Sequence, residues 1–370
     1  MRIESVEIKL RLAVYITPDG KRICGELPAE YNLGHFSAEL RAFCITQYFQ
    51  CHVTAPLLLQ QLYEMGIDIS AAELSNILIQ GQESFHKEKE EIREAGLKYS
   101  DYVNADDTSA RHNGKNGYCI AISSSLFSYF KSGDSKSRIN FLKVLQGDGE
   151  LYAINEEGLN YAFENEISDI ALDKLEESEG KKFRSLAAWQ KFLKKQSIQS
   201  ENDIRIATEA ALVGGVLHIG IDLIKLPIIS DAAPQFSLLV NTLCWVHEER
   251  HYRKLIPISD NERKEIDKVR SEIWNFYAAL KSFKLRPTIN AQMQLSERFD
   301  QIFSAEYPSD ALKTLMANTK FRKEGLLMVL KHSIVPLHNN DCERDIREYA
   351  KRRKISLSSF LKSLVLARSF

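Results

Sequence analysis

The spacing of apolar residues divides the chain into a short β segment, helical stretches and a mixed α/β region. At the N-terminus, Val6, Ile8 and Leu10 alternate with polar residues, and a turn sequence at Pro18–Gly20 separates them from a second run. Alternation beside such a turn is typical of a β-hairpin. The sequence therefore predicts an N-terminal hairpin within residues 1–35.

The pattern changes to a helical period in residues 36–98. Two short helices are predicted on either side of Gly66–Ile69, and Ser70 is placed to cap the second. Such a pair suits a helix-turn-helix unit whose second helix contacts DNA. A plain helical hairpin that only fills a core fits the same pattern. The stretch Gln82–Gly96 is expected to be a charged, solvated helix.

Residues 99–257 carry the strand signals of an α/β core. The segments Tyr102–Thr108 and Tyr118–Ser123 have the pattern of two strands joined by a polar turn. The apolar run that ends at Asp231 has the pattern of a short buried strand. An acidic insert at residues 148–180 is expected to be exposed helix and linker, because charge runs are usually solvated.

Helices dominate the next part of the chain. A long helix from Asp260 is predicted from apolar residues that recur every three or four positions, namely Ile266, Val269, Ile273, Phe276, Leu280 and Phe283. Further helices are expected at Ala291–Phe303 and Ala311–Leu330. Together they form a predicted helical insertion over residues 258–332. Residues 333–370 are expected to hold a last core helix, opened by Asn340 or Asp341, and a basic tail.

The net charge of this 370-residue, 42.3 kDa chain is close to zero, with 49 Lys and Arg against 50 Asp and Glu. Taken alone, this balance argues against a nucleic-acid binder. However, Asp148–Glu179 holds eleven acids and one Lys, so the remainder of the chain is +9. Arg344–Phe370 alone is +6, with eight basic and two acidic residues. A DNA contact local to this last segment, with steep salt dependence, is compatible with the charge pattern.

The cysteines give no sign of a disulfide framework or a cysteine-based zinc module. There are six, widely scattered and without a CxxC pair: Cys24, Cys44, Cys51, Cys119, Cys244 and Cys342. The N-terminus carries charge throughout, and no apolar run approaches the length of a membrane span. We therefore expect free thiols in a reducing cytoplasm, and neither secretion nor membrane insertion.

Acidic residues recur at three informative places. Asp106 and Asp107 lie in the first core strand, Asp231 ends a buried strand, and Glu343 lies in the first turn of the last helix. This layout is typical of RNase H-like nucleases and transposases, in which three carboxylates hold two divalent metal ions. Mg²⁺ prefers such oxygen ligands. Alternatively, Asp106 and Asp107 start a turn, and Glu343 is simply an acid in the first turn of a helix, where the helix dipole favours a negative charge.

Four runs of sequence, in this order, also resemble a known family: YVNADDTSARHNGKNGYC, IISDAAPQF, LCWVHEERHYRKL and VPLHNNDCERDIREYAKRRKIS. They are similar to the signatures of DDE transposases of the insertion sequence sixty-six family, over about residues 28–356. The resemblance implies an α/β fold with an RNase H-like mixed sheet and a large helical insertion. A β-hairpin and a helix-turn-helix-like region would precede that core.

The resemblance also implies roles for the acids. Asp106, Asp231 and Glu343 would be the catalytic triad that binds two Mg²⁺ or Mn²⁺ ions, with Asp107 as the alternative first ligand. Asp106 is preferred because the family motif places the catalytic acid two residues before Thr108. Only one of two adjacent strand residues can face the site. Asp222 is expected to be a turn residue.

Positively charged residues near the proposed site are expected to contact DNA. On the last helix these are Arg344, Arg347, Lys351, Arg352, Arg353 and Lys354, and earlier in the chain Arg250 and His251. For Arg347, a surface ion pair with Asp345 or Glu348 is an equal alternative. Cys244 and His247 are spaced as two metal ligands could be, but no second pair completes a site, so packing and hydrogen bonding are favoured.

The sequence thus predicts a transposase that cleaves DNA at the ends of an insertion sequence and joins it to target DNA. The resemblance implies a homodimer or higher multimer on DNA, in the bacterial cytoplasm at the nucleoid. The chain also lacks the family's usual pattern before the hairpin and after Ser356, so a shortened protein is expected. The alternatives are a catalytically impaired DNA-binding remnant or regulator, and an RNase H-like nuclease that does not join strands.

Overall fold

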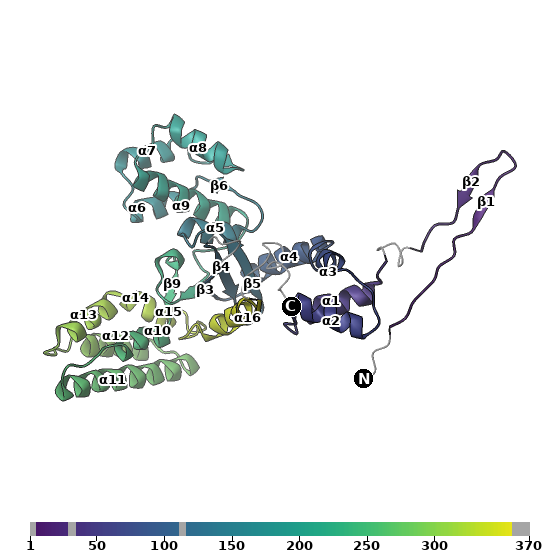
Figure 1. Cartoon of the computed structure of the whole chain (residues 1–370). Helices are drawn as coiled ribbons and strands as arrows, with labels where there is room; N and C mark the ends of the chain where they lie inside the picture. Colours follow the sequence, from purple (N-terminus) through teal and green to yellow (C-terminus); the bar gives the residue numbers. More distant parts are fainter. Residues whose placement is uncertain (1–4, 29–34, 111–115, 357–370) are drawn as a thin grey trace. The chain divides into compact units, whose positions relative to one another are not determined.

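The computed structural model describes residues 5–28, 35–110 and 116–356. The chain forms two compact units (Figure 1). Of the described residues, those up to Lys87 and those of 351–356 belong to one unit, and those between 88 and 350 belong to the other. Among the described residues, no helix is long and apolar enough to cross a membrane.

The first unit begins with the predicted hairpin. Strand β1 (Val14–Ile16) pairs antiparallel with β2 (Arg22–Cys24), and Tyr15 lies opposite Ile23. The turn between them uses Gly20 at a φ of 82°, a conformation that glycine adopts without steric cost. The hairpin expectation is confirmed, although the paired strands are shorter than the alternating pattern.

Three helices follow in the first unit, and they share one small core. They are α1 (Ala38–Phe49), α2 (Ala55–Glu64) and α3 (Ala71–Ile79). Leu58 and Leu62 of α2 pack with Leu74, Ile77 and other apolar residues of this bundle. The Ser70 hydroxyl accepts a hydrogen bond from the Glu73 amide at 3.1 Å, so the predicted cap of α3 is present. Whether α3 contacts DNA stays a prediction.

The second unit is built on a five-stranded mixed sheet. Its strands are β3 (Val103–Ser109), β4 (Tyr118–Ser123), β5 (Ser128–Gly133), β8 (Ile228–Ser230) and β9 (Asn241–Leu243). The order is β5-β4-β3-β8-β9, with β3, β4 and β5 antiparallel and β3, β8 and β9 parallel. This is the RNase H-like arrangement that the sequence predicted. Strands β5 and β9 were not predicted, because Lys131 and Gly133 interrupt the first and the second is only three residues long.

The two faces of the sheet are covered differently. On one face, Val103, Ala105 and Ile120 join a large apolar core with helices α4 (Glu83–Tyr99), α5 (Arg138–Gln146) and α9 (Glu201–His218). On the other face lies α16 (Asn340–Ser356). The Tyr349 ring of α16 stacks on Phe130 of β5, with the ring centroids 6.2 Å apart.

The acidic insert is more ordered than expected. It forms β6 (Tyr152–Ala153), α6 (Glu156–Glu164) and α7 (Asp169–Glu176), followed by β7 (Lys182–Phe183) and α8 (Leu186–Lys195). Tyr152, Tyr161 and Leu175 are buried in the same core as the sheet. The prediction of a linker was therefore wrong, because the acids alternate with apolar residues that anchor both helices.

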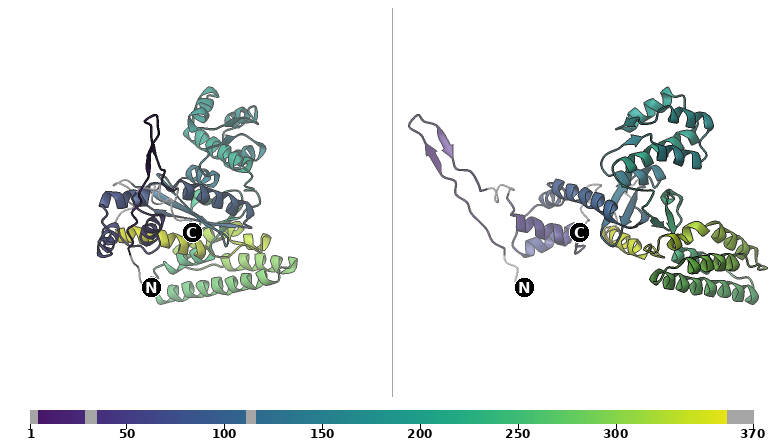
Figure 2. Two further views of the ribbon diagram at one scale, coloured as in Figure 1. Left: turned by 90° about the vertical axis from the view of Figure 1, so that its right-hand side faces the viewer. Right: turned by 180° about the vertical axis from the view of Figure 1, so that it is seen from behind.

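A second core lies in the helical region after the sheet. Its helices are α10 (Trp245–Arg253), α11 (Asp260–Leu285), α12 (Ile289–Phe303), α13 (Asp310–Phe321), α14 (Lys323–Leu326) and α15 (Met328–Lys331). Helices α11, α12 and α13 lie side by side in every view (Figures 1 and 2). All six apolar positions predicted for α11 are buried here. The single helix expected at Ala311–Leu330 is instead divided into three. The domain boundaries proposed from the sequence remain predictions.

Helix α4 also differs from expectation, because one face of it is buried. Lys89, Arg93 and Leu97 are each at most 5% exposed. The Lys89 Nζ atom lies 4.7 Å from the centre of the Tyr129 ring and has no hydrogen-bond partner among the described residues. Burial lowers the pKa of Lys89 to about 8, with the nearby charge of Lys131 acting in the same direction.

Replacing this buried lysine should stabilise the protein in a pH-dependent way. Below pH 8 the folded protein holds a buried positive charge, whereas between pH 8 and 10.5 only the unfolded chain remains protonated at Lys89. Lys89→Met should therefore raise the free energy of unfolding at pH 7 by roughly 2–3 kcal/mol. The gain should shrink as the pH approaches 10.5, the ordinary value for lysine.

Urea unfolding at pH 7 and pH 10 measures this effect. The exposed Lys98 on the same helix provides the matched control, and Lys98→Met should change stability by less than about 0.5 kcal/mol at either pH. An equal gain for both variants, or a Lys89→Met gain independent of pH, would contradict the assignment.

Candidate active site

Asp106 lies in the middle of β3, on the face of the sheet that α16 covers. It pairs with Ala121 of β4, whose carbonyl oxygen lies 3.8 Å from the Cys342 sulfur of α16. Because side chains alternate along a strand, Asp107 faces the opposite side. The structure therefore separates the two neighbouring acids between the two faces of the sheet.

Asp231 directly follows β8, the parallel neighbour of β3. The register pairs Val103 with Ile228 and Asn104 with Ile229. Continued two residues further, past the end of β8, this register places Asp106 and Asp231 at the same level and on the same face. The charge of Asp231 helps to raise the pKa of Asp106, so the two carboxyl groups lie close enough to interact.

The turn after Asp231 is held in an unusual backbone conformation. Ala232 has a φ of 71°, in the left-handed region, which costs a residue other than glycine about 1–3 kcal/mol. The Asp231 Oδ1 atom accepts a hydrogen bond from the Ala233 amide at 3.1 Å. This local bond fixes one carboxylate oxygen of Asp231 against its own turn.

Glu343 is brought to the same region by a buried hydrogen-bonded junction of four chain segments. The Asn339 side chain donates to the Ala105 carbonyl at 3.0 Å, and the Asn339 amide donates to the Cys244 sulfur at 3.3 Å. The Cys244 amide in turn donates to the Ser230 carbonyl at 3.0 Å. Ala105 and Ser230 each precede one of the two aspartates, and Asn339 lies one helical turn before Glu343. The junction thus sets the positions of all three acids.

The electrostatics of Asp106 reflect this convergence. Burial raises the pKa of Asp106 to about 7, and the charges of Asp231, Asp107 and Glu343 act in the same direction. The Asp107 amide opposes the shift by donating a hydrogen bond to Asp106 Oδ1 at 2.8 Å. Carboxylates that repel one another in a buried place are stabilised by a bound cation.

Asp107 lies in different surroundings. Its Oδ2 atom accepts a hydrogen bond from the Gln235 side chain at 2.5 Å. Burial raises the pKa of Asp107, while Gln235 and the charge of Lys136 lower it. Asp107 is therefore held by a neutral amide on the face opposite α16.

The Glu343 carboxylate contacts two residues of α10. Its Oε2 atom lies 3.4 Å from the Arg250 guanidinium, and its Oε1 atom lies 3.4 Å from His247 Nε2. Arg250 also donates to His247 Nε2 at 2.9 Å. Only packing and hydrogen bonding were expected of His247 from the sequence; its spacing from Cys244 and Arg250 on one helix was the available signal for a role in the site.

The donor set suits a hard divalent cation, because it consists of carboxylate oxygens alone. One of these oxygens, Glu343 Oε1, is buried without a hydrogen-bond partner among the described residues. Within residues 5–28, 35–110 and 116–356, however, no three His, Cys, Asp or Glu side chains are already arranged to hold a metal ion. Asp106 and Asp231 are neighbours, whereas Glu343 is directed towards Arg250.

The other predicted residues lie partly on the surface. Arg344, Arg347 and Lys351 of α16 and His251 of α10 are exposed, and Arg344 forms an ion pair with Asp341. The side chains of Arg352, Arg353 and Lys354 fall outside the described residues. Asp222 is a turn residue, as expected, and accepts a hydrogen bond from the Lys225 amide at 3.3 Å.

Comparison with known proteins identifies the family. Residues 234–364 match the family described as "Transposase IS66 family". A protein of Sinorhizobium fredii, named uncharacterized protein y4jO, is 33% identical over 264 residues, which cover 71% of this chain and 82% of that protein. The chain belongs to the IS66 transposase family. The resemblance found in the sequence is thereby confirmed.

The family match covers only part of the candidate site. The matched residues, 234–364, include Arg250, His247 and Glu343, whereas Asp106 and Asp231 lie before them in the chain. The roles of all three acids therefore rest on the geometry of this IS66-family chain and on its motifs, and they remain proposals.

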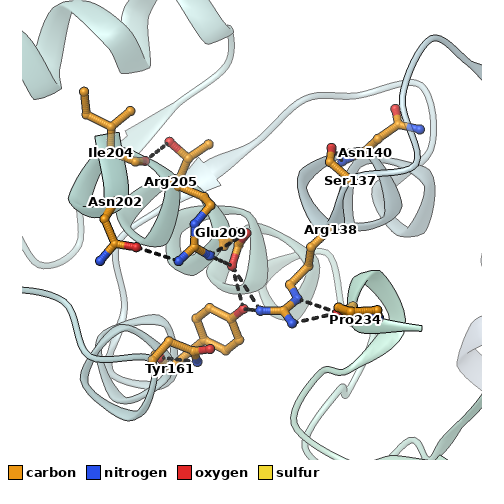
Figure 3. A network of polar contacts seen from close by, with 11 residues as sticks. Ser137, Arg138, Asn140, Tyr161, Asn202, Ile204, Arg205, Glu209 and Pro234 are labelled. Atoms are coloured by element: carbon orange, nitrogen blue, oxygen red, sulfur yellow. Dashed lines mark hydrogen bonds and ion pairs between the residues drawn. The ribbon is translucent and has the colours of Figure 1, made fainter. Parts of the chain in front are cut away.

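A second polar network anchors the turn that follows Asp231 (Figure 3). Arg138 of α5 donates to the Pro234 carbonyl at 2.7 and 3.2 Å, in the short helix η2 (Pro234–Phe236). Buried Glu209 of α9 accepts from Arg138 at 3.3 Å, from Tyr161 at 2.9 Å and from Arg205 at 3.2 Å. The neighbour of Pro234, Gln235, holds Asp107, so the network supports this whole edge of the site.

Removing the charge at the centre of this network should destabilise the protein. Glu209→Gln leaves the largely buried Arg138 without its carboxylate partner, and should lower the free energy of unfolding by roughly 2–4 kcal/mol. Urea unfolding measures the change. The exposed Glu201 of the same helix is the control, since Glu201→Gln should cost less than about 1 kcal/mol. Similar losses for the two variants would show that the network contributes nothing specific.

Proposed function

We propose that this IS66-family protein cleaves DNA at the ends of an insertion sequence and joins the freed end to target DNA. Asp106, Asp231 and Glu343 would be the catalytic residues and would hold two Mg²⁺ or Mn²⁺ ions. The observation that carries the proposal is the junction of Asn339, Cys244, Ala105 and Ser230, which brings three acids from distant parts of the chain to one edge of the sheet.

The reaction requires two displacements at phosphorus. In the first, a water oxygen forms a bond to the phosphorus of a phosphodiester as the P–O3′ bond at the element's end breaks, which leaves a 3′-hydroxyl and a 5′-phosphate. In the second, that hydroxyl attacks a target phosphodiester, and one P–O bond forms as another breaks. When bound, the metal ions would lower the pKa of the attacking oxygen and stabilise the leaving oxygen. The three carboxylates would supply the oxygen ligands and orient them.

DNA is the expected partner, as element ends and as target. Exposed Arg344, Arg347 and Lys351 follow Glu343 along α16, and Arg250 and His251 lie on α10. We propose that these residues and the basic run Arg352–Lys354 contact the DNA backbone, so binding should weaken steeply with salt. We further propose that it acts on paired ends as a homodimer or higher multimer, at the bacterial nucleoid.

Asp231→Asn should reduce strand transfer by at least about 100-fold, because it removes a charged ligand from the proposed metal site. A strand-transfer assay with labelled element ends, target DNA and Mg²⁺ or Mn²⁺ measures the loss. Asp222→Asn is the matched control, since Asp222 lies in a nearby turn and pairs with Lys225. Its joining activity should stay within about twofold of the unchanged protein.

The same assay separates the alternative functions. Unchanged joining by Asp231→Asn would contradict the proposed triad. Cleavage by the unsubstituted protein without joining would identify a nuclease, and DNA binding without metal-dependent cleavage would identify a regulator or remnant.

The two neighbouring acids of β3 should respond differently to substitution. Asp106→Asn should lose at least about 100-fold in joining, because Asp106 faces Asp231 and α16. Asp107→Asn keeps an oxygen that can accept the hydrogen bond from Gln235, and should lose less than about tenfold. The reverse order of losses in the strand-transfer assay would make Asp107 the metal ligand.

A further inference from the structure

The contact between Glu343 and α10 gives this acid a second partner besides the aspartates. Arg250 lies 3.4 Å from Glu343 Oε2, and its other terminal nitrogen lies 2.9 Å from His247 Nε2. A guanidinium only donates hydrogen bonds, so His247 Nε2 must be the acceptor. That nitrogen therefore carries no proton with which to bind Glu343. Arg250 holds Glu343, and neutral His247 holds Arg250.

Helix α10 is itself fixed by buried acids on its other faces. Glu248 accepts hydrogen bonds from Thr319 at 2.5 Å and from Arg322 at 3.2 Å, both in or next to α13. Glu249 accepts from Arg270 of α11 at 2.7 Å. The helical region therefore holds the backbone that carries His247 and Arg250. Arg250 is held at its other terminal nitrogen by His247, whereas Glu343 Oε1 has no hydrogen-bond partner among the described residues, so Glu343 is the more adjustable partner.

The Glu343 carboxylate is needed for two purposes. A divalent cation bound by Asp106 and Asp231 requires a Glu343 oxygen as a ligand, whereas Arg250 holds Oε2, and Oε1, which has no hydrogen-bond partner among the described residues, lies 3.4 Å from His247 on the same helix. The contact with Arg250 therefore orients the carboxylate towards α10, and a turn towards the two aspartates would break it. The Arg250 side chain is 34% exposed and its contact is long, so the pair is weak enough to be displaced.

We propose that Arg250, held by His247, acts as a positioning clamp that competes with the divalent cation for the Glu343 carboxylate. The inference rests on the proposed function, because it assumes that Glu343 is a metal ligand. In the cation-free protein the clamp keeps Glu343 turned towards α10. Cation binding then requires Glu343 to leave Arg250 and turn towards Asp106 and Asp231.

The test is the Mn²⁺ affinity of the whole protein without DNA, measured from the electron paramagnetic resonance signal of free Mn²⁺. Arg250→Gln should bind Mn²⁺ about three- to tenfold more tightly, because the competitor for Glu343 is lost. In the Glu343→Gln background the same substitution should change the affinity by less than about twofold. The exposed Arg253 of the same helix is the charge control, and Arg253→Gln should also change it by less than about twofold.

The double-mutant cycle separates the clamp from a general effect of charge. Equal tightening by Arg250→Gln with and without Glu343 would mean that Arg250 repels the cation directly, and would overturn the clamp. Unchanged or weaker binding by Arg250→Gln would overturn it as well. Should Arg250→Gln not fold, Arg250→Lys keeps the charge but cannot span His247 and Glu343, and tightening by at least about twofold is expected; no tightening would overturn the clamp.

Failure of the underlying function gives a different result. If Asp106→Asn and the unsubstituted protein bind Mn²⁺ equally, the carboxylates do not form a cation site, and the proposed function is wrong. If Asp106→Asn weakens binding but the cycle shows no coupling between Arg250 and Glu343, the site stands and only the clamp is wrong.

Discussion

The buried junction around Asn339 is the interaction on which the candidate site depends. One side chain amide and two backbone amides connect β3, the β8 end, the start of α10 and the start of α16. Each of these segments carries or directly precedes a residue of the site. Asn339 is fully buried, and Cys244 is 2% exposed, so the hydrogen bonds form away from water. An unpaired buried polar group costs about 1–3 kcal/mol, which favours one arrangement of these segments. The hydrogen bonds of Cys244 agree with the packing and hydrogen-bonding role expected for it from the sequence.

The convergence of carboxylates has an electrostatic cost in the absence of a counter-charge. Burial and neighbouring acids raise the pKa of Asp106, and Glu343 is compensated by Arg250 instead. The negative charge of these carboxylates can thus be balanced in two ways, by the guanidinium of Arg250 and, in the proposed function, by a divalent cation. Helix α10, which carries Arg250, is held in place by the helical region, because its buried residues Glu248 and Glu249 accept hydrogen bonds from Thr319 and Arg270. In this fold the aspartates of the proposed site can be in position before a cation binds, while Glu343 is held by Arg250.

Much of the fold could be predicted from local pattern, whereas most of the site could not. The period of α11, the strand that contains Asp106 and the turn at Asp222 each follow from neighbouring residues alone. Strand β9 is stabilised by pairing with β8, a contact invisible in three residues of sequence. The acidic segment was misjudged because charge was counted without the apolar residues between the acids. The contacts of Arg250 with Glu343 join residues 93 positions apart. No local sequence pattern specifies these contacts. The three acids could be grouped from the sequence only by their places in predicted strands and a predicted helix and by the order of the motifs.

The most direct test of the account is a crystal structure of the protein with Mn²⁺, in which anomalous scattering locates the ion. Mn²⁺ should be coordinated by Asp106 and Asp231, with a Glu343 oxygen about 2 Å from the ion and no longer in contact with Arg250. Mn²⁺ bound elsewhere, or carboxylates of Asp106 and Asp231 that remain without the ion at saturating concentration, would contradict it.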